Sequence, residues 1–413
     1  MLLPVVARGE ESGYGYPIAS SYSATILGTP HKLRATVAGK VPIEDLVLAS
    51  DQAKPDVFFY DRGLRYTAAF QDHKAPLVFL IAGTGGSSRS GKIVTLTQNL
   101  YQAGFHVIAL PSPTFPNFII NASSTHVPGH LVGDAADLYR AMAAIWGQWR
   151  GKVEVSGFYL SGYSLGGTEA AFVGKLDEEQ KLFDFRKVLM INPAVSLYHS
   201  VARIEALLDR IPGGPRRIGA FFNRAMDKFT AFYHKGDHVA IDDDFLFEAY
   251  QAQLFNRDEE GGLIAVSFRI GSAAMIFTSD VMTNGGYVVP KNKVLQHSDP
   301  LHDYFWTSLH LSFLDYFNEY FYPYFQRKDP GLTKEKLMES LSLKSIEGYL
   351  AGCDKVAVIT NEDDFILAPG ELDYLRRVFG PRLTVYPRGG HLGNLEYRDN
   401  MAQVIATLRS AKR

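Results

Sequence analysis

The residues Gly162-Tyr163-Ser164-Leu165-Gly166-Gly167 form a G-x-S-x-G motif between an apolar segment, 153–160, and a segment of helical character, 166–176. The first segment predicts a strand and the second a helix. A serine on such a sharp turn is held in strained backbone geometry with its hydroxyl exposed, and side chains at the flanking glycines would clash with the strand and helix. The alternative is an ordinary glycine-rich turn. In this context the motif predicts that Ser164 is a nucleophile.

The histidine of a second glycine-rich segment, Gly389-Gly390-His391-Leu392-Gly393, is the predicted partner of Ser164. A serine hydroxyl is a weak nucleophile and needs a base, which in turn needs an acid to orient it. Of the 12 histidines, only His391 lies just after a late predicted strand. The alternative is a histidine on a surface loop. We expect His391 to be the base.

The acid is expected after the preceding strand, which the apolar segment 355–360 predicts. Three carboxylates follow it, at Glu362, Asp363 and Asp364. We choose Asp364 because the apolar residues 365–367 behind it would anchor the loop against the core. Asp363 is the alternative acid, and a solvated acidic turn is the alternative interpretation.

Two backbone amides are candidates to stabilise an oxyanion. The Leu165 amide lies at the predicted helix N-terminus, where an anion is stabilised. The segment Ala82-Gly83-Thr84-Gly85-Gly86 ends the apolar run 77–82, which predicts a buried parallel strand. We expect the Thr84 amide to be the second donor, with Gly85 as the alternative.

Strands and helices alternate over much of the chain. Apolar runs at 105–110 and 188–191 and the segment 383–386 predict further strands, and 133–149, 371–379 and the end of the chain from about residue 396 predict helices. Such alternation is typical of a mostly parallel central sheet flanked by helices, the α/β class. Short strands are predicted at 22–27, 56–60 and 65–71. We therefore divide the chain into N-terminal strands that join the core sheet (1–74), an α/β core (75–198 and 352–413) and a mainly helical insertion (199–351).

The order and context of these four segments resemble the α/β-hydrolase superfamily of serine hydrolases. The resemblance covers about 75–198 and 352–413. It implies that Ser164 is the nucleophile, His391 the base and Asp364 the acid, with Thr84 and Leu165 as the oxyanion amides. One departure is Ala82, where many members have a histidine before the glycine. The resemblance also places the cap insertion between the sixth and seventh strands of the superfamily's usual numbering.

Aromatic residues are concentrated in the predicted insertion. Between Tyr304 and Phe325, 11 of 22 residues are aromatic. Phe305, Leu309, Phe313, Phe317 and Phe321 recur at every fourth position, which aligns them along one helix. They are expected either to form the core of the insertion or to wall an apolar substrate pocket. As substrate-binding residues we name Phe305, Phe313, Phe317 and, within the serine motif, Tyr163.

Two other patterns are interpreted as structural. The residues 86–93 nearly match a phosphate-binding loop, but Ile93 stands where a hydroxyl would bind magnesium. His234, Asp237 and His238 lack regular ligand spacing, so a charged loop is favoured over a metal site. No metal and no cofactor is expected.

Composition limits the other functions. Hydrophobic residues make up 46% and charged residues 21%, which allows a large core, and the net charge of -2 gives no reason to expect nucleic acid. A single cysteine, Cys353, excludes an internal disulfide framework and a multi-cysteine metal site. No run of 18 apolar residues appears, so no integral membrane segment is expected. The compartment is taken as cytoplasmic by default, and an exported form that has lost its signal is left open. The oligomeric state is also left open.

The expected reaction is hydrolysis of a small-molecule carboxylic ester or thioester with an apolar acyl or aromatic group, through an acyl-enzyme. Two alternatives remain open. The same residues suit a peptidase or an acyltransferase, and a catalytically silent relative would use the pocket only to bind a ligand.

Overall fold

A computed structural model describes residues 13–235 and 243–410 of the chain. One eight-stranded sheet has the strand order β1-β2-β4-β3-β5-β6-β7-β8. The pairs β1–β2 and β2–β4 are antiparallel, and all later pairs are parallel. The strands are β1 (Glu44–Ala49), β2 (Gly63–Ala69), β3 (Ala75–Ile81), β4 (His106–Leu110), β5 (Val155–Tyr163), β6 (Lys187–Ile191), β7 (Val356–Asn361) and β8 (Leu383–Tyr386). The mostly parallel sheet expected from the sequence is confirmed.

Both faces of the sheet are buried, which explains why its central strands are continuously apolar. Along β3, Leu77, Phe79 and Ile81 enter one hydrophobic core, and Val78 and Leu80 enter the other. Helices α4 and α5 pack on the first face, and α2 and α16 pack on the second. The helices before β6 are α1 (Ser21–Leu27), α2 (Gly91–Gln102), α3 (Pro116–Asn121), α4 (Leu131–Trp149) and α5 (Leu165–Gln180), and those after β7 are α15 (Glu371–Phe379) and α16 (Arg398–Arg409).

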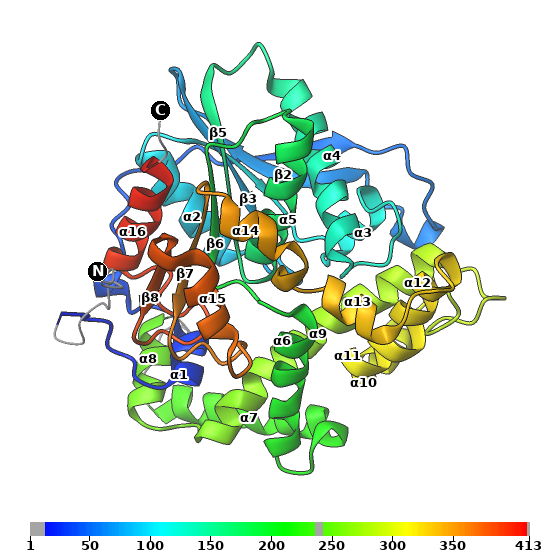
Figure 1. Cartoon of the computed structure of the whole chain (residues 1–413). Coiled ribbons are helices and arrows are strands. Elements are labelled where there is room, and N and C mark those ends of the chain that lie inside the picture. Colours follow the sequence, from blue (N-terminus) through cyan, green and yellow to red (C-terminus); the bar gives the residue numbers. More distant parts are fainter. Residues whose placement is uncertain (1–12, 236–242, 411–413) are drawn as a thin grey trace.

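The segment between β6 and β7 is helical and contributes no strand to the sheet in its described residues. Figure 1 shows its helices, coloured green to orange, mostly gathered beside one end of the sheet. They are α6 (Leu197–Glu205), α7 (Ile218–Lys235), α8 (Asp243–Gln251), α9 (Arg257–Thr283), α10 (His302–His310), α11 (Phe313–Asp315), α12 (Tyr322–Lys328), α13 (Lys334–Ser340) and α14 (Glu347–Gly352). The mainly helical insertion therefore lies between the sixth and seventh strands, as expected.

One helix of the insertion, α9, is long and apolar enough to cross a membrane by length and composition alone. Helix α9 was not predicted as a membrane segment, because charged and polar residues are spread along it and interrupt any run of 18 apolar residues. Of its most apolar window, 61% is buried inside the protein, as in the core helix of a globular domain. Its apolar character is therefore weak evidence for a membrane span.

The N-terminal region differs from the prediction in three places. Residues 22–27 belong to the helix α1 and not to a strand, because the Ser20 hydroxyl accepts a hydrogen bond from the Ser23 amide and caps a helix there. Residues 56–58 form a 3₁₀ turn after Pro55, where a strand was predicted. The strand β1 was missed because it begins with two acidic residues and lies at the edge of the sheet, where alternate side chains are exposed.

The predicted single aromatic helix is wrong. Helix α10 ends at His310, Leu311 is extended, and Ser312 starts a new helix with a capping box to Asp315. A π-helical turn, η5 (Tyr316–Phe321), then follows. In a π-helix the hydrogen bonds run from residue i to residue i+5 and the turn is wider, so the helix is not the regular α-helix that the sequence predicted, although Phe317 and Phe321 still stack on each other.

Candidate functional site

Ser164 lies on the turn between β5 and α5, with backbone angles φ 55° and ψ −127°. This left-handed region is costly for a residue other than glycine, and such strain is often found at functional sites. A Cβ on Gly162 would lie 2.2 Å from the Gly166 carbonyl oxygen, and one on Gly166 would lie 2.4 Å from the Ala82 carbonyl oxygen. The two flanking glycines therefore allow the close contact between strand and helix that the turn requires.

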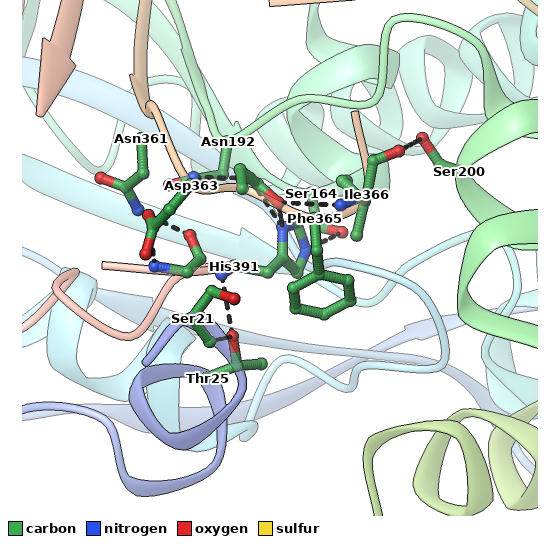
Figure 2. A network of polar contacts seen from close by, with 12 residues as sticks. Ser21, Thr25, Ser164, Asn192, Ser200, Asn361, Asp363, Phe365, Ile366 and His391 are labelled. Atoms are coloured by element: carbon green, nitrogen blue, oxygen red, sulfur yellow. Dashed lines mark hydrogen bonds and ion pairs between the residues drawn. The ribbon is translucent and has the colours of Figure 1, made fainter. Parts of the chain in front are cut away.

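The structure brings together the three side chains that the sequence singled out (Figure 2). The Nε2 atom of His391 lies 2.9 Å from the Oγ atom of Ser164. On the other side of the ring, Nδ1 lies 3.0 and 3.1 Å from the two carboxylate oxygens of Asp364. Asp364 is 4% exposed. It lies beside the His391 ring, and Asp363, the alternative acid, does not contact the ring.

Asn192 is a residue of this site that sequence reasoning missed. Its Nδ2 donates a hydrogen bond of 2.8 Å to Oδ2 of Asp364, and the Ile366 amide donates to Oδ1. Asn192 is buried and follows β6 directly, at the edge of the sheet where β5 and β7 also end. A polar residue directly after a buried parallel strand was the available signal. These donors hold the Asp364 carboxylate toward His391.

Asp363 contacts the backbone of the histidine loop instead of the ring. Its Oδ1 accepts a hydrogen bond of 2.9 Å from the Gly390 amide. Burial raises the pKa of the Asp363 carboxyl, and the neighbouring Asp364 carboxylate adds to this, against hydrogen bonds from the Gly390 and Gly389 amides. The two adjacent aspartates therefore have different partners.

The N-terminal helix α1 also holds the His391 loop. The Thr25 hydroxyl accepts a hydrogen bond of 2.8 Å from the His391 amide, as Figure 2 shows. A Cβ on Gly390 would lie 2.1 Å from the Ser21 carbonyl oxygen, and one on Gly393 would lie 2.1 Å from the Ala24 carbonyl oxygen. The loop glycines thus permit direct contact with α1. Nothing in the local sequence of α1 indicated this contact.

The two residues that carry the predicted oxyanion amides line a common cavity. Thr84 and Leu165 line the same cavity beside Ser164, because β3 and β5 are neighbouring strands. Within the described part of the chain, neither amide donates to a protein acceptor. The Gly85 amide, which was the alternative donor, instead donates 2.8 Å to the Thr114 hydroxyl.

The cavity is apolar and none of its lining residues is charged. Its walls come from the ends of β3 and β5 and from α6, α9 and the aromatic segment of the insertion. The lining residues are Thr84, Thr114, Pro128, Gly129, Leu165, Leu197, Val201, Phe268, Ser272, Met275, Phe313, Tyr316, Phe321 and Leu341. Such a lining accepts an uncharged, mainly apolar group.

Only one of the four predicted substrate-binding residues lines this cavity, namely Phe313. Phe317 is buried in the core behind it, and Phe305 lies 38% exposed on α10, beyond the helix break. Tyr163 packs against Gly83, where a Cβ would lie 2.7 Å from its ring. Tyr316 and Phe321, the first and last residues of the π-helical turn, line the cavity instead.

Together, the two patterns interpreted as structural are described only in part. Among residues 13–235 and 243–410, no group of three or more His, Cys, Asp or Glu side chains is placed to hold a metal ion. Asp237 and His238 lie outside the described residues. Gly91 and Lys92 begin helix α2, preceded by a turn in which the Ser87 amide donates to the Ser90 hydroxyl.

Two buried carboxyl groups lie on the neighbouring helices α4 and α5. Glu169 is fully buried, and in the described residues neither of its carboxyl oxygens has a hydrogen-bond partner. Asp134 accepts a hydrogen bond of 2.7 Å from the Gly129 amide. Burial raises the pKa of both groups well above the usual range, and repulsion from Asp134 raises that of Glu169 further. Glu169 is therefore protonated in the folded protein at pH values where the unfolded chain has lost this proton.

The free energy of unfolding is accordingly expected to fall as the pH rises above the unfolded value of 4.5 for glutamate. For each pH unit over which the folded state keeps this proton and the unfolded state has lost it, the free energy of unfolding falls by about 1.4 kcal/mol. Glu169→Gln cannot ionise, so its stability should fall less steeply with pH. Urea unfolding of both proteins across this range measures the difference. Glu179→Gln, an exposed change on the same helix, should keep the wild-type slope. Equal slopes for wild type and Glu169→Gln would contradict this account.

The strand order, the serine turn after β5 and the helical insertion after β6 define the α/β-hydrolase fold, and the chain has this fold. A protein from Legionella pneumophila assigned as a hydrolase superimposes with a TM-score of 0.50 at 10% identity, covering 95% of this chain and 96% of the other. An esterase from Rhizomucor miehei gives a TM-score of 0.45 at 14% identity, covering 90% and 84%. The 2-hydroxy-6-oxo-6-phenylhexa-2,4-dienoate hydrolase from Rhodococcus sp. strain RHA1 gives 0.45 at 16% identity, covering 90% and 100%. No family model matches the chain, and no curated protein does.

Proposed function

We propose that this protein is a serine hydrolase that cleaves a carboxylic ester or thioester through an acyl-enzyme. The observation that carries the proposal is the distance of 2.9 Å between Oγ of Ser164 and Nε2 of His391, with the Asp364 carboxylate on the far side of the ring. A nucleophile, a base and an orienting acid in this order activate a hydroxyl for acyl transfer.

In the proposed mechanism the Ser164 oxygen attacks the substrate carbonyl carbon while His391 takes the hydroxyl proton at Nε2. The Thr84 and Leu165 amides donate to the resulting oxyanion, and Asp364 stabilises the imidazolium. Collapse of the intermediate breaks the bond to the leaving group, which receives the proton from His391. Water then attacks the acyl-enzyme with His391 again as base, which releases the acid and restores Ser164. The reaction needs no cofactor.

The substrate we propose is a small molecule with an apolar acyl or aromatic group. The cavity beside Ser164 carries no charged lining residue, so a charged group would lose its hydration without a partner there. We propose that residues 199–351 act as a cap, since α6, α9 and the segment around Phe313 supply most of the cavity wall. Residues 75–198 and 352–413 would then be the catalytic core.

The proposal is tested by exposing the protein to a fluorophosphonate probe, which reacts with activated serines. We expect one stoichiometric adduct on Ser164, located by intact mass and peptide mapping. The adduct should be absent in His391→Ala, because the hydroxyl then lacks its base. A well-folded wild-type protein that gives no adduct and no turnover on a broad ester panel would contradict the proposal and favour a ligand-binding role.

A further inference from the structure

The wall of the apolar cavity contains four hydroxyl groups, on Thr84, Thr114, Ser272 and Tyr316. Two of them are already engaged. The Thr114 hydroxyl accepts a hydrogen bond from the Gly85 amide and contacts the Ser112 hydroxyl at 2.8 Å, and the Tyr316 hydroxyl donates to the Pro128 carbonyl oxygen at 3.1 Å. Thr84 is exposed to solvent. Water satisfies an exposed hydroxyl, so only Ser272 remains to be explained.

Ser272 is 4% exposed and lies on α9 between Phe268 and Met275, which also line the cavity. The spacing of four and three residues places all three on one face of the helix. Within the described part of the chain, the Ser272 hydroxyl makes no hydrogen bond. Two other hydroxyls on helices of the insertion donate to the carbonyl of the preceding turn, Thr283 to Ser279 at 2.8 Å and Ser308 to Tyr304 at 3.0 Å.

The Ser272 oxygen is not among the fully buried polar atoms, so it opens onto the cavity, where an alanine or a larger apolar residue would have completed an apolar wall. A hydrogen-bonding group held in this way at a ligand cavity is typical of a site that pairs with a polar group of its substrate. Because a hydroxyl both donates and accepts, either a hydroxyl or a carbonyl group of the substrate satisfies it. The absence of charged residues from the cavity lining disfavours a carboxylate or an amine.

We propose that Ser272 forms a hydrogen-bonding subsite for a neutral polar substituent on the acyl chain, so that the preferred substrates are esters of hydroxy- or oxo-substituted acids. This inference rests on the proposed function. Thr84 and Leu165 would hold the reacting carbonyl at one part of the cavity, and Ser272 would bind the substituent at another. The rest of the lining would bind the apolar part of the chain.

The test compares aryl esters of an unsubstituted acid with a set of esters that moves one hydroxyl or keto group along the same chain. In the wild-type protein, kcat/KM should be highest for one position of the substituent. In Ser272→Ala the advantage of that ester over the unsubstituted one should fall about tenfold, since a hydrogen bond is lost only for the substituted ester. Turnover of the unsubstituted ester should change little.

Ser267→Ala is the matched control, because Ser267 lies on the same helix with its residue exposed. It should keep the wild-type preference. An equal preference for the substituted ester in wild type and Ser272→Ala would overturn the inference. In that case the proposed function would still stand if turnover of the unsubstituted ester is lost in Ser164→Ala. Failure of the wild-type protein to cleave any of the esters, with no probe adduct on Ser164, would overturn both.

Discussion

Ser164→Ala is expected to lower kcat/KM for ester hydrolysis by about 10⁴-fold or more while the protein remains folded. The variant lacks the oxygen that forms the acyl-enzyme, so only binding and the two oxyanion amides remain to accelerate attack by water. The backbone strain at φ 55° is the same for alanine as for serine, and no structural hydrogen bond of the hydroxyl is lost apart from that to His391. Activity on an ester panel and thermal unfolding measure the two halves of the prediction.

The matched control for this variant is Ser156→Ala, an exposed position at the start of the same strand, β5. It should retain wild-type activity. Contaminating esterase is excluded with a parallel preparation that lacks this protein and should show no activity. Turnover by Ser164→Ala at the wild-type level would then refute the acyl-enzyme mechanism.

Asp364→Asn is expected to lower kcat by about 10⁴-fold, far more than Asp363→Asn. An asparagine at 364 can present its amide nitrogen to Nδ1 of His391, which favours the tautomer with no free lone pair to accept the Ser164 proton. At position 363 the relevant contact is from the Gly390 amide to Oδ1, and the asparagine oxygen accepts that bond as well as the carboxylate does. Since burial already raises the pKa of Asp363, a neutral side chain suits that position.

The two variants serve as controls for each other, because each removes one charge from adjacent positions of the same loop. Both should be folded by circular dichroism, and the comparison is made on the same ester. A larger loss in Asp363→Asn than in Asp364→Asn would transfer the role of the acid to Asp363.

Several features of this chain were determined by short stretches of its sequence. The central strands were predicted because a strand covered on both faces must be apolar throughout, as 77–82 and 188–191 are. The serine turn was predicted because only glycine fits at 162 and 166, where a Cβ would collide with the backbone. The candidate site residues Ser164, His391 and Asp364 follow from these strands, since the ends of parallel strands meet at one edge of the sheet.

Other features depended on contacts between segments far apart in the chain. Asp363 and Asp364 are chemically identical, and they differ because Asn192 and His391 contact Asp364 whereas the Gly390 amide contacts Asp363. Helix α1 holds the His391 amide across a separation of 366 residues, and its cap at Ser20 gave no sign of that contact.

The cavity wall was also decided by tertiary structure. A repeat of four residues was a sound reason to predict one aromatic helix, but the cap at Ser312 and the π-helical turn after it replaced Phe305 and Phe317 in the wall with Tyr316 and Phe321. Periodicity reports which residues an unbroken helix would place on one face, whereas the packing of that helix against α6 and α9 decides which rings line a cavity. The sequence by itself thus determined the chemistry of the candidate site, and the tertiary structure decided the shape and polarity of the space beside it.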